Sequence, residues 1–283
     1  MPLALTTEQV ENYHRDGFAS PVRVLSEEQS AEYRARFEAY ENANGGWYEM
    51  SKGQKLYLLQ TWVAELVRSP RVLDGVQDVL GSDILCWGCS LFVKEAQHPG
   101  YVSWHQDSTY WGLSKPDVAT AWIALSPASE LSGCMKMLPA SHTQQQMPHH
   151  DTLADNNLLT RGQEVAVDVN EAQARLLPLQ AGEMSLHNIR TVHASEPNQS
   201  DDRRIGLAIR YITPQVRQIE APKDSAWLLR GEDNTGNWIH ETPPNHDMDA
   251  DALREHERIM LLRQAVLYKN IEGQPAHTKL DAS

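Results

Sequence analysis

The chain has little cysteine, little positive charge and no long hydrophobic run. Three of its 283 residues are cysteine, which is too few for a disulfide scaffold and favours a reducing compartment. The apolar run over residues 118–129 contains Pro127 and is far shorter than a membrane span, and residues 1–5 are too few for a signal peptide. We therefore expect a soluble, cytoplasmic protein.

The scarcity of positive charge restricts the possible partners. Lys and Arg number 25 against 38 Asp and Glu, a net charge of −13, and no Lys/Arg cluster interrupts this balance. Such a surface repels nucleic-acid backbones and anionic membranes, so we expect a small-molecule substrate, no nucleic acid and no membrane. The G-x-S-x-G, P-loop and G-x-G-x-x-G motifs are also absent. The oligomeric state stays open.

The order of elements predicts a single domain of mainly β structure with a helical jacket. Helical spacing dominates the first eighty residues, with capping boxes at Thr6/Gln9 and Ser26/Gln29. A helix is expected over 249–268, and strands are expected over 84–94, 101–111, 119–125, 183–187 and 205–213. We divide the single domain 1–283 into an N-terminal helical region (1–82), a β core (83–215) and a C-terminal extension (216–283).

Twelve histidines stand out, and three of them begin an H-x-D tripeptide, namely His14, His105 and His149. On a strand, two residues separated by one other share a face, with Cα atoms about 6.6 Å apart, which suits two ligands of one metal. The first tripeptide lies at a helix end and the third in a polar stretch that we expect to be solvated. Only His105 and Asp107 lie in a strand-like run.

A third ligand is expected from a later strand, and His193 is the candidate. Two histidines and a carboxylate form the facial triad of non-haem Fe(II) oxygenases and leave three positions open. A zinc hydrolase uses the same ligand set, and a buried histidine can also be purely structural. The triad alone therefore leaves these alternatives open.

An arginine on the following strand favours the oxygenase. Arg204 comes eleven residues after His193 and shares one strand face with Gly206, Ala208 and Arg210. Among such small residues we expect open space in front of Arg204, where a guanidinium can bind a carboxylate with two hydrogen bonds. For the neighbouring Arg203 we expect only a salt bridge at the rim, to Asp201 or Asp202.

The pair Cys86 and Cys89 has C-x-x-C spacing but lies in the expected strand 84–94. Residues three apart in a strand point to opposite faces, so the two sulfurs cannot share one metal ion. We expect core cysteines.

Several motifs together resemble the phytanoyl-CoA dioxygenase family over residues 16–211. They are WHQD at 104–107, AW at 121–122, GCM at 133–135, LPASH at 138–142, HASEPNQSD at 193–201 and the strand 204–211. The resemblance implies a double-stranded β-helix (jelly roll, cupin-like) and dependence on Fe(II), 2-oxoglutarate and O2. It implies iron ligation by His105, Asp107 and His193.

The resemblance also implies how the cosubstrate is held. Arg204 matches the partner of the distal 2-oxoglutarate carboxylate, with Ser195 as an auxiliary donor. Trp122 matches a tryptophan of the cosubstrate pocket and is equally compatible with a core position. Lys94 matches a lysine on the strand before H-x-D and is compatible with lining the cavity mouth.

The reaction implied is hydroxylation, or a related oxidation, of an unactivated C–H, with release of succinate and CO2. Halogenating relatives carry Gly or Ala in place of Asp107, so halogenation is disfavoured. No basic patch suits coenzyme A, and we expect a small polar metabolite. The substrate-side candidates are Gln106, Trp111, His187 and Arg210. The stretch 142–158 is expected to be a lid or a solvated insertion, and the alternatives are a zinc hydrolase and a non-catalytic jelly-roll binding protein.

Overall fold

The computed structural model describes residues 1–46, 53–152, 154, 156–159, 162–221 and 223–267. Its largest unit is a seven-stranded sheet with the order β1-β9-β4-β11-β2-β12-β13. The strands are β1 (Phe18–Arg23), β2 (Ile84–Lys94), β4 (Val118–Ala124), β9 (Glu183–Asn188), β11 (Arg204–Ile212), β12 (Ser225–Arg230) and β13 (Ile239–His240). All neighbours are antiparallel except the pair β12 and β13.

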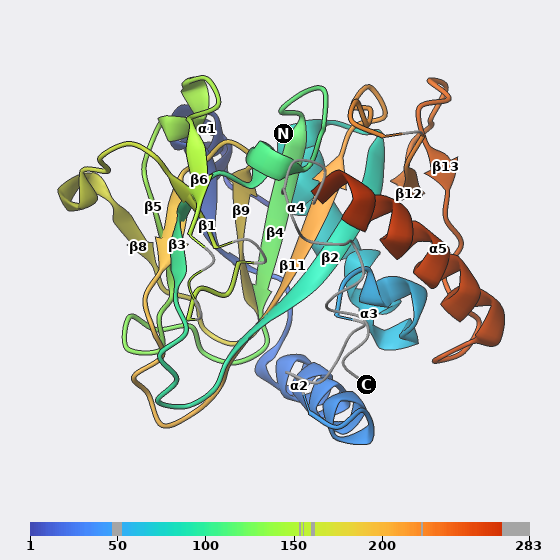
Figure 1. The fold of residues 1–283 in the computed structure, drawn as a ribbon, viewed down its shortest axis with the longest axis horizontal. Helices are drawn as coiled ribbons and strands as arrows, with labels where there is room; N and C mark the ends of the chain where they lie inside the picture. Colours follow the sequence, from blue (N-terminus) through green and yellow to red (C-terminus); the bar gives the residue numbers. More distant parts are fainter. Residues whose placement is uncertain (47–52, 153, 155, 160–161, 222, 268–283) are drawn as a thin grey trace.

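A four-stranded sheet with the order β3-β10-β5-β8 faces the large one (Figure 1). Its strands are short: β3 (Val102–His105), β5 (Met135–Met137), β8 (Arg175–Leu177) and β10 (His193–Ser195). A separate antiparallel pair consists of β6 (His149–Asp151) and β7 (Gln163–Val165). Two antiparallel sheets with this arrangement form a jelly roll, as the resemblance implied.

Helices lie mainly on one side of the large sheet, and α5 packs at the β2–β12 end (Figure 1). The α-helices are α1 (Thr7–Asp16), α2 (Glu27–Ala43), α3 (Thr61–Val67), α4 (Pro70–Leu80) and α5 (Ala250–Leu267), and the 3-10 turns are η2 (Leu56–Leu58), η3 (Asp107–Tyr110), η4 (Ser141–Thr143) and η5 (Glu171–Gln173). Both predicted capping boxes are present, at α1 and α2. Position 268, the expected end of the last helix, lies outside the described residues. None of the described helices has the length and apolarity needed to cross a bilayer.

β11 runs through the centre of the large sheet and separates two environments. Ile205, Leu207 and Ile209 join the apolar cluster between the sheet and the helices. Ala208, on the opposite face, packs with residues of the small sheet, and Arg204 lines a cavity there. The predicted alternation along this strand is therefore confirmed.

Two expectations about the elements are wrong. The N-terminal region is not purely helical, because β1 forms an edge of the large sheet, where Pro21 is tolerated since an edge strand has unpaired N–H positions. Cys86 and Cys89 do not face opposite ways, since both join the helix-side cluster. A register shift opposite Arg210 inserts one extra residue into β2 and reverses the alternation there.

Candidate functional site

Three potential metal ligands meet between the two sheets. β3 supplies His105 and β10 supplies His193, and these residues are direct partners in the antiparallel register. Asp107 follows β3, and ligand atoms of all three side chains lie within 4.8 Å of one another. The imidazole ring centres are 4.1 Å apart, and Asp107 Oδ1 lies 3.5 Å from His105 Nε2. Within the described ranges no other group of His, Cys, Asp or Glu has this geometry.

The strand predicted over 101–111 ends at His105, and Asp107 instead begins η3. The residue between them, Gln106, nevertheless keeps an extended backbone, with φ −111° and ψ 134°. One extended residue is enough to bring the side chains on either side of it to the same face. His105 and Asp107 therefore share a face, as predicted, although the strand is shorter than predicted.

Backbone carbonyls fix the orientation of both imidazoles. His105 Nδ1 lies 2.9 Å from Ser103 O, and His193 Nδ1 lies 2.9 Å from Thr191 O. A carbonyl only accepts, so each Nδ1 carries the proton and donates it. Nε2 of each ring then presents a lone pair, as in metal sites whose histidines donate through the other nitrogen.

The protonation states also suit a metal. Burial, with His105 nearby, lowers the pKa of His193 well below its usual range and keeps this imidazole neutral. Burial alone would raise the pKa of Asp107, yet His105 and His187 stabilise its carboxylate and the net pKa lies well below the usual range. Neutral imidazole and ionised carboxylate are the forms that bind metal.

Arg204 is a buried cation that no carboxylate of the described chain compensates. It is 2% exposed, its Nη1 donates to Gly133 O at 2.6 Å, and its Nε has no hydrogen-bond partner. Burial lowers the pKa of Arg204 to about 10. A buried, partly unsatisfied guanidinium is costly unless it binds an anion. This residue is therefore suited to the carboxylate of a ligand.

Arg204 lines a cavity, in agreement with the open space expected in front of it, but the space in front of Gly206 is filled by the indole of Trp122. A Cβ at Gly206 would lie 1.9 Å from this ring, so only glycine fits. The guanidinium carbon of Arg204 lies 5.3 Å from the ring centre, within range of a cation–π contact. Trp122 is 4% exposed and lines the cavity.

Lys94 lies deep in the protein rather than at the cavity mouth. It is fully buried and pairs in register with Arg204 across β2 and β11. Its Nζ donates to Ser195 Oγ at 2.8 Å and also to the carbonyl of Glu196. Burial, together with the positive charge of Arg204, lowers the pKa of Lys94 to about 6. Lys94 thus orients the hydroxyl of Ser195, which lines the cavity.

One cavity joins these groups. Besides the three potential ligands, its lining includes Arg204, Ser195, Trp122, His187, Arg210 and Thr120. His187 is 2% exposed, and neither ring nitrogen has a hydrogen-bond partner among the described residues. Its Nε2 lies 3.8 Å from Asp107 Oδ2. Two of the four substrate-side candidates, His187 and Arg210, therefore face the same space as the potential ligands.

The other two candidates, Gln106 and Trp111, are absent from this lining. The side chain of Gln106 donates to Arg190 O at 2.8 Å and accepts from the backbone N–H of Met147 at 2.8 Å. Trp111 packs on Trp87 with ring centres 5.1 Å apart. Both residues contact neighbours of the site rather than the cavity.

Sequence reasoning missed His149, which we expected to be solvated. Its Nε2 accepts the backbone N–H of Gln106 at 3.0 Å, between two of the potential ligands, and its Nδ1 donates to Met147 O at 2.9 Å. It belongs to β6 and not to a loop. The H-x-D spacing that drew attention to it carries no information about this contact, which joins residues 43 positions apart.

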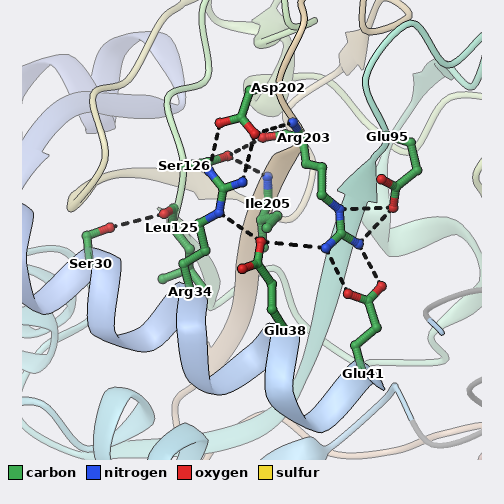
Figure 2. Close-up of polar contacts among 10 residues, drawn as sticks. All are labelled: Ser30, Arg34, Glu38, Glu41, Glu95, Leu125, Ser126, Asp202, Arg203 and Ile205. Atoms are coloured by element: carbon green, nitrogen blue, oxygen red, sulfur yellow. Dashed lines mark hydrogen bonds and ion pairs between the residues drawn. The ribbon is translucent and has the colours of Figure 1, made fainter. Parts of the chain in front are cut away.

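A network of ion pairs joins α2 to the residues that lead into β11 (Figure 2). Arg203 donates to both oxygens of Glu41, at 2.7 and 2.6 Å, and to Glu95 Oε1 at 2.7 Å. Arg34 binds both oxygens of Asp202, each at 2.7 Å. The expected salt bridge of Arg203 to Asp201 or Asp202 is therefore wrong, because α2 supplies its carboxylate partner. The network fixes the backbone that leads into Arg204.

Comparisons with known proteins agree with this geometry. The family model of Phytanoyl-CoA dioxygenase (PhyH) matches residues 13–206. A probable alpha-ketoglutarate-dependent hypophosphite dioxygenase of Stutzerimonas stutzeri is 30% identical over 179 residues, which cover 62% of this chain and 58% of that protein. The chain thus spans somewhat over half of the length of this curated relative.

Solved structures resemble the chain over nearly its whole length. The apo structure of the non-heme monooxygenase ThoJ is 33% identical, with a TM-score of 0.84, and the match covers 94% of this chain and 100% of that chain. The nickel complex of ThoJ is 30% identical, with a TM-score of 0.78 and coverages of 93% and 100%. The chain belongs to the phytanoyl-CoA dioxygenase (PhyH) family of Fe(II)- and 2-oxoglutarate-dependent oxygenases.

Proposed function

We propose that this protein is a non-haem dioxygenase that hydroxylates an unactivated C–H of a small molecule and releases succinate and CO2. His105, Asp107 and His193 would hold Fe(II). One observation carries the proposal: two features line the same cavity. The first is a group of two histidines and one carboxylate, and the second is a buried arginine that has no carboxylate partner among the described residues.

The residues fit the iron and its cosubstrate. Two neutral imidazoles and one carboxylate leave three coordination positions open, enough for a bidentate keto acid and O2. When bound, Fe(II) and 2-oxoglutarate supply the oxidising power for C–H cleavage, which the protein does not have by itself. Asp107 provides the carboxylate ligand that a halogenating site lacks, so hydroxylation is the favoured outcome.

The chain's own groups bind and orient the cosubstrate. Arg204 would take its distal carboxylate through the unpaired Nε and the remaining guanidinium N–H groups. Ser195 would add a hydrogen bond, since Lys94 occupies its oxygen as an acceptor and leaves its proton for the ligand. Trp122, which lines this end of the cavity, would pack against the bound cosubstrate and exclude water from it.

A zinc hydrolase would use the same three ligands, but it needs no keto-acid cosubstrate, so the buried guanidinium of Arg204 favours the oxygenase. The relative from Stutzerimonas is named for a small inorganic substrate, which agrees with a small polar substrate here. Three buried free thiols are compatible with the cytoplasmic location that we propose.

The test is anaerobic reconstitution of the apoprotein with Fe(II) and 2-oxoglutarate, followed by exposure to O2. We expect the metal-to-ligand charge-transfer band before exposure and succinate afterwards, with neither in His193→Ala. Zn(II) is the matched control. Activity with zinc and indifference to 2-oxoglutarate would overturn the proposal in favour of the hydrolase, and the absence of both band and succinate in wild type would also reject it.

A further inference from the structure

A second arginine faces the cavity from the opposite end of β11. Arg210 follows Arg204 by six residues on the same strand face, so their Cα atoms lie about 20 Å apart at ~3.3 Å per residue. Lys94, in register with Arg204, donates to Ser195 near one end of the ligand group, and Thr120, in register with Arg210, donates to Asp107 at the other. One five-carbon diacid that also binds the metal cannot extend to both arginines.

Arg210 belongs to a row of polar side chains across three strands. Register pairs Arg210 with Thr120, and Thr120 with His187. All three residues line the cavity. The hydroxyl of Thr120 donates to Asp107 Oδ2 at 3.4 Å, so the row passes beside the metal ligands. A guanidinium, a hydroxyl and an imidazole thus share one wall.

The guanidinium of Arg210 is held in one orientation with donors to spare. It is 9% exposed, Nη1 donates to Ser90 Oγ at 2.8 Å, and Nε has no hydrogen-bond partner. Its central carbon lies 5.4 Å from the ring centre of Trp111 and 5.8 Å from that of Phe92. No carboxylate of the described residues forms an ion pair with it within 4.0 Å.

A stack of side chains packs against the guanidinium of Arg210 through the ring of Trp111. Trp111 packs on Trp87, and the guanidinium carbon of Arg263 lies 4.1 Å from the ring centre of Trp87. Arg263, on α5, also donates to Trp87 O at 2.6 Å. This stack extends from the C-terminal helix to the cavity wall, so Arg210 has little freedom to turn away. A preorganised cation of this kind is typical of a binding site.

The balance of charge leaves Arg210 without a counterion. The two charges of Fe(II) and the charge of Arg204 match those of Asp107 and a 2-oxoglutarate dianion. The charge of Arg210 then remains uncompensated in a buried site, which is unfavourable unless a further anion binds. This argument rests on the proposed function.

We propose that Arg210, together with His187, binds an anionic group of the substrate, such as a carboxylate or a phosphonate. The site is distinct from the cosubstrate site at Arg204. An anionic group anchored there places the rest of the substrate beside Asp107 and the metal, where the C–H must lie to be oxidised. The substrate class is therefore a small organic monoanion.

The test uses trifluoroacetate and its neutral analogue trifluoroacetamide as fluorine NMR probes of the anaerobic Fe(II)- and 2-oxoglutarate-loaded protein. We expect saturable paramagnetic relaxation of the trifluoroacetate fluorines, clearly stronger than that of trifluoroacetamide. The charge-transfer band of the same sample shows whether 2-oxoglutarate stays bound. This comparison needs no variant, and equal relaxation of the two probes would overturn the proposal.

Variants then assign the site. Arg210→Gln should reduce the excess relaxation about tenfold, because it removes the charge-assisted hydrogen bonds to the anion. Its 2-oxoglutarate dissociation constant should stay within about twofold of wild type, while Arg210→Lys should retain part of the probe binding. Arg258→Gln, which removes an exposed pair with Glu255 on α5, is the matched control.

Two results would contradict the assignment. Undiminished probe relaxation in Arg210→Gln would remove Arg210 from the anion site. A 2-oxoglutarate affinity weakened about tenfold in that variant would assign Arg210 to the cosubstrate instead. Failure of the proposed function is distinguishable from both, because the wild type would then show no charge-transfer band at all.

Discussion

Arg203 directly precedes β11 and Arg204 begins it, yet their side chains point to opposite sides of the large sheet and lie in opposite electrostatic environments. Arg203 points to α2 and binds Glu41 and Glu95 (Figure 2). Arg204 points into the cavity, where its one hydrogen-bond acceptor among the described residues is Gly133 O. The described chain thus supplies carboxylates to the partly buried guanidinium of Arg203 and none to the buried guanidinium of Arg204, which we propose binds a ligand.

This difference suggests a criterion that separates ligand-binding arginines from structural ones, namely whether the protein itself supplies a carboxylate partner. Both residues are arginine, both are at least half-buried, and they stand side by side where β11 begins. What separates them is whether the protein supplies the anion. An arginine already bound to carboxylates stabilises the fold, whereas a buried arginine without one marks a site for an anionic ligand.

The largest effect is expected on the cavity side, at the metal. His193→Ala should lower succinate formation by more than about 100-fold, because even the loss of an outer partner of a metal ligand costs 10–100-fold. The measurement is succinate formed per protein, with Fe(II) content by metal analysis. Iron content and turnover equal to wild type would remove His193 from the site.

The next effect concerns Arg204 itself. Arg204→Gln should raise the dissociation constant of 2-oxoglutarate about 10–100-fold, since charge-assisted hydrogen bonds contribute about 1.5–3 kcal/mol. Quenching of tryptophan fluorescence on titration reports this binding, because Trp122 lies beside the guanidinium. An unchanged dissociation constant would show that the unpaired arginine serves another purpose.

A pH effect should follow from Lys94. Burial, together with the positive charge of Arg204, lowers the pKa of Lys94 to about 6 against the opposite effect of Glu196 and Cys134, so Lys94 is mostly neutral at pH 8. A bound dicarboxylate stabilises the ammonium, so binding takes up a proton and should tighten about tenfold from pH 8 to pH 6. Calorimetry in buffers of different ionisation enthalpy measures the proton uptake. The Lys94→Met variant should bind 2-oxoglutarate without taking up a proton. Proton uptake that persists in this variant would exclude Lys94 as the group that is protonated.

A smaller effect, of a different kind, is expected on the helix side. Arg203→Gln should lower the free energy of unfolding by about 1–2 kcal/mol, between the values for exposed and buried ion pairs. Its affinity for 2-oxoglutarate should stay within about twofold of wild type. Urea denaturation measures the first quantity. A stability equal to wild type would show that the network around Arg203 contributes nothing measurable.

The smallest effect is expected at the exposed pair of Arg36 and Glu32, on the same helix as Glu41. Arg36→Gln should change the free energy of unfolding by less than about 0.5 kcal/mol, because exposed pairs of this spacing contribute little. It is the matched control for Arg203→Gln in the same denaturation experiment. If both variants lost the same free energy of unfolding, the burial of the ion pair would not determine its contribution to stability.

The cavity side of β11 was predictable because its signal is local. Alternation along one strand places Arg204, Gly206 and Arg210 on one face, and H-x-D spacing places two side chains together whenever the residue between them is extended. The helix ends at Thr6 and Ser26 were equally local, since each capping box involves four consecutive residues. These features need no knowledge of the rest of the fold.

What sequence reasoning missed depends on contacts between distant residues. The partner of Arg203 is Glu41, 162 positions away, whereas Asp201 and Asp202 are adjacent in sequence. The depth of Lys94 follows from its pairing with Arg204, and the orientation of Cys86 from a bulge in β2, and neither has a local signature. Local spacing shows which face a residue takes, but not what lies opposite that face.

The most direct test of the account is a 2-oxoglutarate titration of Fe(II)-loaded Arg203→Gln and Arg204→Gln proteins, followed anaerobically by the charge-transfer band. We predict a wild-type midpoint for Arg203→Gln and a midpoint raised about 10–100-fold for Arg204→Gln. Equal midpoints in the two variants, or a larger shift for Arg203→Gln, would contradict the claim that the arginine without a carboxylate partner is the one that binds the cosubstrate.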